Sequence, residues 1–302
     1  METKSTLKIG KHQVEVSNPD KIFWPEEKFT KGDVIGYYRK MAKVILPYLK
    51  DRPESLNRHP DGINGENFYQ KDVDHQGPDW LKTIGIHSES AGKTVRYLVC
   101  DDEATLVYMA NLGCIEINPW HSRIDAQSHP DYCLIDLDPQ GVEFDTVVDV
   151  AHTVHEILEK AGAKHLVKTT GKRGMHMLIP LGAKFTYDRS RHFAKTLVDI
   201  VNERLPKTTS LERHPEDRKH KVYLDYLQNS KGQTMAAPYC MRPIGGLRVS
   251  TPLEWSEIRH GMDPANFNIK TIFHRLATHG DLMKPILGRG IDIERCLLKL
   301  EK

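Results

Sequence analysis

Residues 131–139 read Asp-Tyr-Cys-Leu-Ile-Asp-Leu-Asp-Pro, a short apolar run that carries two carboxylates near its end. In a β-strand successive side chains point to opposite faces, so Asp136 and Asp138 share one face. Two like charges on an apolar strand repel each other and resist burial, and a divalent cation between them removes that cost. The pattern predicts a strand that ends in a metal site. A strand that runs out into a solvated turn at Pro139 is the alternative that the residues leave open.

A third carboxylate, Asp225, lies near the end of a second short apolar run, Val-Tyr-Leu-Asp at residues 222–225. Two metal ions about 4 Å apart need more carboxylate oxygen than one strand face supplies. A neighbouring strand that contributes Asp225 would complete the ligand set of Asp136 and Asp138. A solvent-facing aspartate on an edge strand is the other interpretation.

Residues 169–176 read Thr-Thr-Gly-Lys-Arg-Gly-Met-His, with two glycines around two cations. Glycines let backbone N–H groups approach an anion closely, and Lys172 and Arg173 add positive charge. The hydroxyl of Thr170 and the imidazole of His176 add hydrogen-bonding groups. Because the segment joins two strand-like runs, we interpret it as a hairpin that cradles a triphosphate. A basic hairpin tip at the surface, with His176 satisfied in the core, is the alternative.

Two further basic features lie downstream. Arg242 follows a run of small and apolar residues, so we expect it to be drawn inside toward negative charge, at a ligand site or in a structural ion pair. Residues 212–221 are rich in basic side chains, Arg218 among them, and directly precede the Asp225 strand. Contact with a DNA backbone is therefore reasonable, while the acidic residues of the same run also fit a solvated loop.

The composition limits the class of protein. With 302 residues, of which 39% are hydrophobic, the chain can bury a sizeable core without disulfides. A net charge of +2 means that nucleic-acid binding must come from local basic patches. The five cysteines include no Cys-x-x-Cys pair, which disfavours a zinc ribbon and predicts buried thiols in a reducing compartment. No apolar run is long enough to span a bilayer, and the N-terminus lacks a signal core.

Hydrophobic periodicity predicts both helices and strands. We expect helices over residues 30–46, 144–160 and 188–205, another starting at 251–254, and a helical C-terminal third. The first helix begins with Thr30 as cap and Asp33 at the capping-box position, and Pro47 and Pro53 end it. Strands are expected over residues 7–16, 95–99, 114–117, 165–170, 175–181 and 221–226. This irregular alternation predicts an α+β fold with mixed or antiparallel sheets flanked by helices.

Several linked motifs follow one another along the chain. They are Ser17-Asn-Pro-Asp-Lys21, Thr30-Lys31, Arg58-His-Pro-Asp-Gly62, Phe68-Tyr-Gln-Lys71, Gly113-Cys-Ile-Glu-Ile-Asn-Pro-Trp120, Asp136-Leu-Asp138-Pro, Lys168-Thr-Thr-Gly-Lys-Arg-Gly-Met-His176, Asp225-Tyr-Leu-Gln228-Asn229, Arg242-Pro and Val249-Ser-Thr-Pro-Leu-Glu-Trp255. In this order they resemble the polymerase domain of bacterial ligase D and its stand-alone archaeal relatives, in the archaeo-eukaryotic primase superfamily. The resemblance covers nearly the whole chain.

The resemblance implies a template-directed DNA and RNA nucleotidyltransferase that extends 3′ ends and fills gaps in non-homologous end joining. By the family pattern two divalent cations, manganese or magnesium, would be held by Asp136, Asp138 and Asp225. The residues expected to bind the incoming nucleotide are Asn118, Thr170, Lys172, Arg173, His176, Gln228 and Arg242. Those expected to bind the 5′-phosphate or the template of DNA are Lys21, Lys31, Arg58, Phe68, Tyr69 and Arg218.

The resemblance also implies partners and a domain plan. The expected partners are DNA ends with a 5′-phosphate, nucleoside triphosphates with ribonucleotides preferred, a Ku-like end-binding protein and an ATP-dependent DNA ligase, with no membrane. We expect a prokaryotic cytoplasmic protein associated with the nucleoid, either a stand-alone polypeptide or an excised domain. A single domain, 1–302, would divide into a DNA-binding part at 1–110, a catalytic core at 111–260 and C-terminal helices at 261–302.

Two positions depart from the family pattern. Asn118 stands where many members have histidine, and an amide can donate a hydrogen bond but carries neither a proton for transfer nor a charge. Thr170 replaces the usual serine and keeps the hydroxyl. Two other functions fit part of the pattern. A non-catalytic DNA-end-bridging module would need the phosphate grip alone, and a metal-dependent nuclease would use the aspartates but leave the cradle of residues 171–176 without a role.

Overall fold

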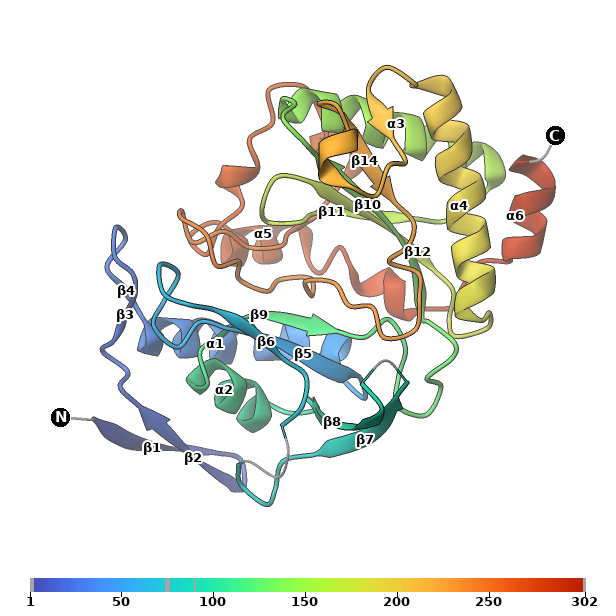
Figure 1. The fold of residues 1–302 in the computed structure, drawn as a ribbon. Helices are drawn as coiled ribbons and strands as arrows, with labels where there is room; N and C mark the ends of the chain where they lie inside the picture. Colours follow the sequence, from blue (N-terminus) through green and yellow to red (C-terminus); the bar gives the residue numbers. More distant parts are fainter. Residues whose placement is uncertain (1–2, 74–76, 90, 301–302) are drawn as a thin grey trace.

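The computed structural model describes residues 3–73, 77–89 and 91–300 (Figure 1). The stretch that carries the two aspartates forms β10 (Tyr132–Pro139) inside a six-stranded sheet. This sheet runs, in order, β13 (Thr209–Ser210), β14 (Val222–Asp225), β10, β12 (Met175–Pro180), β11 (Leu166–Thr169) and β15 (Pro252–Leu253). Only β13 and β14 pair in parallel among these neighbours, so the predicted α+β fold with mixed or antiparallel sheets is confirmed.

One face of the six-stranded sheet is covered by helices. Ile135 and Leu137 of β10 point into a core that also receives the apolar sides of α3 (Phe144–Ala161), α4 (Tyr187–Arg204) and α6 (Ile293–Leu300). The three helices contact one another, and Figure 1 shows α4 and α6 side by side at this end of the molecule. Because alternate residues of a strand face opposite ways, burying Ile135 and Leu137 turns Asp136 and Asp138 to the other face.

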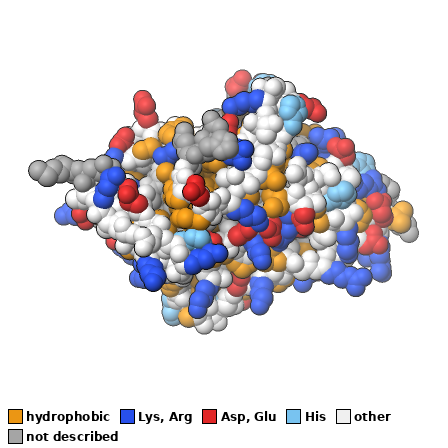
Figure 2. All heavy atoms as spheres, turned by 90° about the horizontal axis from the view of Figure 1, so that it is seen from below, with side chains coloured by type: hydrophobic (Ala, Val, Ile, Leu, Met, Phe, Trp, Pro, Cys, Tyr) orange, Lys and Arg blue, Asp and Glu red, His pale blue; other side chains and the backbone are white. Residues whose placement is uncertain are grey.

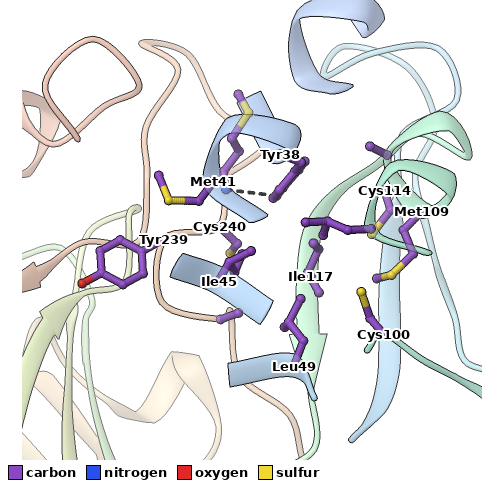
Figure 3. Close-up of a cluster of buried hydrophobic side chains, with 14 of the residues drawn as sticks. Tyr38, Met41, Ile45, Leu49, Cys100, Met109, Cys114, Ile117, Tyr239 and Cys240 are labelled. Atoms are coloured by element: carbon purple, nitrogen blue, oxygen red, sulfur yellow. Dashed lines mark hydrogen bonds between the residues drawn. The ribbon is translucent and has the colours of Figure 1, made fainter. Parts of the chain in front are cut away.

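The second large sheet belongs to the N-terminal half. It runs β6 (Phe68–Gln70), β5 (Pro53–Arg58), β8 (Lys93–Val99) and β7 (Thr83–Ser88), and β9 (Cys114–Pro119) also pairs with β5. The helices α1 (Lys31–Leu49) and α2 (Glu103–Asn111) pack on it, and Figure 3 shows Met41 and Ile45 of α1 beside Ile117 of β9. The hairpin β1 (Lys4–Ile9) and β2 (His12–Ser17) and the short pair β3 (Ile22–Trp24) and β4 (Phe29–Thr30) complete this half.

The two halves share a core at the start of β10. Tyr132 and Leu134 lie on the same strand face as the aspartates, and both are buried in the cluster that holds α1 and β9. Farther along this face, Asp136 and Asp138 are only partly buried. At the start of β10 the N-terminal half covers this face of the strand. At the end of β10, around the two aspartates, the same face is open.

Several local predictions are confirmed. Thr30 caps α1, with a capping box in which its hydroxyl accepts from the backbone N–H of Asp33 and the Asp33 carboxylate accepts from the backbone N–H of Thr30. The helices α3 and α4 and the strands β10, β11, β12 and β14 lie where periodicity predicts them, within one or two residues. All five cysteines are free thiols and buried.

Other local predictions are wrong. Residues 7–16 form two strands, because Gly10, with φ +57°, turns the chain between β1 and β2. Pro47 lies inside α1, where a proline near the C-terminal end removes only one backbone hydrogen bond, while the buried Tyr48 and Leu49 after it stabilise the last turn.

The two remaining errors concern the C-terminal part. No helix begins at Thr251, because Pro252 and Leu253 pair with β11, and the capping box moves to Glu254 at the start of a short 3₁₀ helix, η2 (Trp255–Glu257). Within the described part of residues 261–302, the α-helices are α5 (Ile272–His279) and α6, joined by turns and short 3₁₀ helices, so this region is less helical than predicted. Residues 301–302 lie outside the described part.

The surface carries both signs of charge. Figure 2 shows Lys and Arg side chains interspersed with Asp and Glu over one face of the molecule. Among the described residues, no helix combines the length and the apolar composition needed to cross a membrane.

Candidate active site

Three carboxylates meet on the open face of the six-stranded sheet. Asp136 of β10 and Asp225 of β14 stand opposite each other in the antiparallel register, and Asp138 follows two residues along β10. Opposite residues of adjacent antiparallel strands lie about 4.5–5.5 Å apart at Cα. The strands therefore bring together the three aspartates that were named from two separate stretches of sequence.

Burial makes two of the carboxylates, Asp136 and Asp225, costly to ionise. It raises the pKa of Asp136 to about 6, against the opposing effect of Lys168, Arg242 and Arg218. The pKa of Asp225 is also raised, first by burial and then by the charge of Asp136. A divalent cation would relieve both effects, and an all-oxygen donor set suits magnesium or manganese. The chemistry of these residues fits a divalent cation.

Asp138 is held by arginines. Its carboxylate accepts from Nη1 of Arg218 at 3.0 Å and lies 3.4 Å from Nε of Arg173. Arg218 is buried and lies over the ring of Tyr223, 4.0 Å from its centroid. Within residues 3–73, 77–89 and 91–300, the three aspartates do not all bring an oxygen within 4.8 Å of the other two. A cation held by all three would therefore need these side chains to move closer together.

The predicted cationic hairpin joins β11 to β12 beside the aspartates. Gly171 has φ +75°, which turns the chain at the tip. The Thr170 hydroxyl accepts from the backbone N–H of Lys172 at 3.1 Å and of Gly174 at 3.2 Å, and so closes the loop on itself. Arg173 projects from the tip with an exposed side chain.

Arg242 lies inside, as predicted, and its partner is an acid that sequence reasoning missed. Nη2 of Arg242 lies 3.2 Å from the carboxylate of Glu116, and its Nη1 donates to the Thr170 carbonyl at 2.8 Å. Nζ of Lys172 lies 4.0 Å from the same carboxylate. Glu116 is buried in β9. A glutamate in the middle of an otherwise apolar strand is the signal that could have indicated it.

A neutral imidazole stands next to the carboxylates. His176 is opposite Asp136 in the register of β10 and β12, and its Nε2 lies 3.4 Å from an Asp136 oxygen. Burial lowers the pKa of His176, and the charges of Lys168 and Arg242 lower it further. Its Nδ1 finds no hydrogen-bond partner within the described part of the chain. His176 is thus a buried, neutral group with one ring nitrogen still available.

Lys168 is the second buried group that sequence reasoning did not assign. Its ammonium donates to the Ser250 hydroxyl at 2.5 Å, and burial lowers its pKa to about 7. A lysine inside an apolar strand was visible in the sequence, but only the sheet register shows that Lys168 lies opposite His176, which in turn lies opposite Asp136. Lys168 affects the pKa values of both.

One cleft of about 970 Å³ collects most of the predicted nucleotide site. Of the nucleotide-binding and metal residues predicted from sequence, those that line it are Asn118, Asp136, Asp138, Thr170, Lys172, Arg173, His176, Gln228 and Arg242. Gln228 also donates to Asp225 at 3.0 Å, and Asn118 to the Glu116 carbonyl at 3.3 Å. Further lining residues, not predicted, include Ser55, Lys71, Glu116 and Arg248. The cleft receives residues from both large sheets.

The residues predicted to contact DNA are distributed over three places. Tyr69 lines the cleft and is 56% exposed, and its neighbour Phe68 is 47% exposed and lies against Arg58. Lys21 and Lys31 meet at the start of α1, where the Lys31 N–H donates to the Lys21 carbonyl at 2.8 Å.

The two lysines differ in environment, and the remaining DNA residue lies elsewhere. Lys21 is exposed and pairs with Asp61, whereas Lys31 is buried and its ammonium donates to the Ser17 carbonyl at 2.6 Å. Arg218, which follows a short 3₁₀ helix before β14, lies with Asp138 and not with the lysines. The DNA-binding roles of all six residues stay predictions.

Comparisons with known proteins point to one family. Residues 30–283 match the family model described as LigD, primase-polymerase domain. The chain is 30% identical over 272 residues to the bifunctional non-homologous end joining protein LigD of Bacillus subtilis, covering 89% of this chain and 43% of that protein. It is 28% identical over 279 residues to the multifunctional non-homologous end joining protein LigD of Mycolicibacterium smegmatis, covering 91% and 36%. The chain thus spans less than half the length of these relatives.

A solved structure shares the fold. The polymerase domain from Mycobacterium tuberculosis Ligase D in complex with DNA superposes with a TM-score of 0.84 at 26% identity. The match covers 91% of this chain and 98% of that one. The shared fold therefore extends well beyond the six-stranded sheet, over 91% of this chain.

Proposed function

This chain belongs to the LigD primase-polymerase domain family, and from that premise we propose that it adds nucleotides to the 3′ end of a DNA strand under the direction of a template. Nucleotidyl transfer is the activity that the family implies. The observation that carries the proposal is the register of β10 and β14, in which Asp225 faces Asp136, while Asp136, Asp138 and the cationic hairpin line one cleft. A nuclease would need the carboxylates but not the cradle of Lys172, Arg173 and Arg242.

In this proposal Asp136, Asp138 and Asp225 hold two divalent cations, manganese or magnesium. Such a pair lowers the pKa of the attacking 3′-hydroxyl and neutralises charge on the triphosphate and the departing pyrophosphate. The raised pKa values of Asp136 and Asp225 support the assignment, because two partly buried carboxylates side by side carry an electrostatic cost that a cation would relieve.

The incoming triphosphate would bind between the hairpin and Arg242. Arg242 and Lys172 share Glu116 as an acidic partner, so the pair is already positioned at the cleft before an anion arrives. Arg173 and Arg248 add positive charge at the mouth. His176 would donate a hydrogen bond as a neutral group, because its surroundings disfavour the imidazolium. Asn118 and Gln228 line the same cleft and can hydrogen-bond to the sugar or the base.

The DNA would lie across the N-terminal half. We propose that Lys21, with Lys31 beside it, binds the 5′-phosphate of the downstream strand, since ammonium groups bind phosphate as point charges. The exposed rings of Phe68 and Tyr69 would stack on template bases, because an aromatic face accepts any base. The solved relative was captured in complex with DNA, which supports a DNA substrate here.

The names of the relatives support a place in non-homologous end joining. We propose that the substrates are DNA double-strand-break ends with a 5′-phosphate and nucleoside triphosphates, with ribonucleotides preferred. A Ku-like end-binding protein and an ATP-dependent ligase would act with it, in the cytoplasm of a prokaryote and at its nucleoid.

The deciding experiment is primer extension on a gapped duplex with Asp225→Asn. We expect a loss of roughly 10³-fold or more in rate, because a catalytic metal supplies several kcal/mol and each ~1.4 kcal/mol is tenfold. The amide keeps the size of the side chain, so the circular dichroism spectrum and the melting curve should match the parent. Asp217→Asn, at an exposed aspartate nearby, is the matched control and should keep full activity.

Extension by Asp225→Asn at the parent rate with manganese would refute the two-metal assignment. If the parent fails to extend any primer while still binding 5′-phosphorylated ends, the chain is an end-bridging module.

A further inference from the structure

A second group of metal-ligating side chains lies away from the cleft. Among the described residues, a set of three or more histidine, cysteine or acidic side chains with ligand atoms within 4.8 Å of one another occurs at His155, Glu159 and His165. The proposed function uses none of them. They lie on α3 and at the entry to β11, and α3 packs on the face of the sheet that holds Ile135 and Leu137, opposite the aspartates.

The helix end and the turn after it bring the three side chains together. His155 and Glu159 are four residues apart on α3, so they lie on one helix face. Gly162, with φ +68°, ends the helix and reverses the chain. His165 then returns beside His155, and its Nε2 lies 2.7 Å from Nδ1 of His155.

The hydrogen bonds of His165 determine its tautomer. Nδ1 of His165 lies 2.7 Å from the Ala163 carbonyl, which can only accept, so the proton is on Nδ1. Nε2 of His165 therefore presents a lone pair toward His155. Histidines that bind metals commonly donate their other ring N–H to a backbone carbonyl in this way, which holds the ring in place.

The second imidazole is held by an aromatic ring. Trp255 of η2 stacks on His155, with ring centroids 3.9 Å apart and planes 20° apart, and meets His165 edge-on at 5.3 Å. Glu159 has a side chain that is 64% exposed, and its carboxylate lies 3.9 Å from Nδ1 of His165, so it would have to swing toward Nε2 to complete the set. Two ligands are thus fixed by packing and the third is flexible.

We propose that His155, Glu159 and His165 form a binding site for one zinc-class transition-metal ion, with the fourth position open to water. Two imidazole nitrogens and one carboxylate suit zinc, whereas magnesium and manganese prefer oxygen alone. Bonds of about 2.0–2.1 Å in a tetrahedral site put two nitrogens roughly 3.3 Å apart, so the two rings need to separate by only a fraction of an ångström. In the metal-free protein Nδ1 of His155 donates to Nε2 of His165; on binding, His155 would lose that proton to solvent, offer the Nδ1 lone pair to the metal and carry its ring proton on Nε2.

The site would tie the end of α3 to the start of β11, whose far end leads into the 171–174 hairpin. Its effect should be on stability, because the ligands lie on the opposite side of the sheet from the cleft. A ligand that binds the native state and not the unfolded state stabilises the native state. Zinc at saturating concentration should therefore raise the melting temperature by roughly 2 °C or more.

The test is calorimetric titration of Zn²⁺ into the chelator-treated chain carrying Asp136→Asn, which weakens the carboxylate site. We expect one equivalent of zinc to bind, with an affinity at least tenfold lower in His155→Gln and in Glu159→Gln. Glu156→Gln, an exposed glutamate on the same helix, is the matched control and should bind zinc as its parent does.

Cobalt gives a readout that does not require the ligand variants His155→Gln and Glu159→Gln to fold. Co²⁺ added to the Asp136→Asn chain should give the visible absorption of a four-coordinate site, and Zn²⁺ should displace it. The inference is overturned if no zinc binds, if Co²⁺ stays six-coordinate, or if His155→Gln and Glu159→Gln bind zinc as tightly as Glu156→Gln. None of these outcomes depends on polymerase activity, so this inference and the proposed function stand or fall separately.

Discussion

At Asp136, burial disfavours the charge that metal binding requires. The folded protein raises the pKa of this carboxyl to about 6, above the ordinary value of 3.8, so the folded state holds a proton that the unfolded state has lost over that interval. Stability therefore falls as the pH rises from about 4 to about 6, and the loss persists above it. This cost exists in the metal-free protein and would be offset by a bound cation.

We expect Asp136→Asn to be more stable than the parent at pH 7 in the presence of a chelator. The free energy of unfolding should increase by roughly 1–3 kcal/mol, the size that corresponds to this pKa shift. The increase should vanish near pH 4, because the Asp136 carboxyl of the folded parent is then protonated. Urea unfolding at the two pH values measures it. Asp217→Asn, at an exposed site, should show no gain at either pH. If the parent and the variant are equally stable at pH 7, burial of the ionised Asp136 carboxylate does not destabilise the protein.

Glu116 and Lys168 show why single residues in the site escape sequence analysis. Each is one charged residue in an apolar strand, and this pattern equally fits a local ion pair or an outward-facing side chain. Their environment comes from other segments: Arg242 meets Glu116, and Ser250 accepts from Lys168.

At the scale of elements, the β11–β12 hairpin and the segment that carries Arg242 are fitted closely together. A Cβ atom on Gly171 would lie 2.5 Å from Cγ of Arg242 and 2.9 Å from the Ser250 nitrogen. The same residue has φ +75°, which costs an alanine about 1–2 kcal/mol. The hairpin can keep this contact with Arg242 only because position 171 is glycine.

Gly171→Ala should therefore weaken nucleotide binding more than it weakens the fold. Displacing Arg242 removes a charged hydrogen bond of about 1.5–3 kcal/mol, so KM for the nucleoside triphosphate should rise roughly tenfold or more. Gly245→Ala is the matched control, because a Cβ there meets no atom within 4 Å in the described part of the chain. Steady-state extension at varied triphosphate concentration separates the two. Equal KM values would show that Arg242 does not depend on the hairpin.

At the scale of the whole molecule, the cleft is built between two sheets with different tasks. The six-stranded sheet supplies the aspartates and the hairpin, while β5, β6 and β9 of the N-terminal sheet supply Ser55, Tyr69 and Asn118. The exposed lysine at the start of α1 belongs to this N-terminal half. Recognition of the downstream DNA end should therefore be separable from catalysis.

Lys21→Ala should lower affinity for gaps with a 5′-phosphate by roughly tenfold, the size expected for one charged contact, and leave unphosphorylated gaps nearly unchanged. Fluorescence anisotropy with paired duplexes measures both. Lys43→Ala, which removes an exposed charge from α1, should change neither. Lys31 is the poorer test, because its buried ammonium holds Ser17 and its loss should also destabilise the fold. Equal losses on both duplexes would remove Lys21 from the 5′-phosphate site.

What the sequence determined by itself is local. The alternation that turns Asp136 and Asp138 to one face, the glycine turn of the hairpin and the Thr30 cap follow from residues within one strand, turn or helical turn of one another. Hydrophobic period, turn chemistry and capping act over such distances, so they could be predicted without coordinates.

Only the tertiary structure decided which segments meet. The register of Asp225 against Asp136, the pairing of Pro252 with β11 in place of a helix start, and the contact of Arg242 with Glu116 join stretches far apart in the chain. Such contacts form because strand edges must be paired and buried charges must find partners. Many segments share the same local pattern, so these requirements can be met by several pairings. Only the folded structure shows which segments pair.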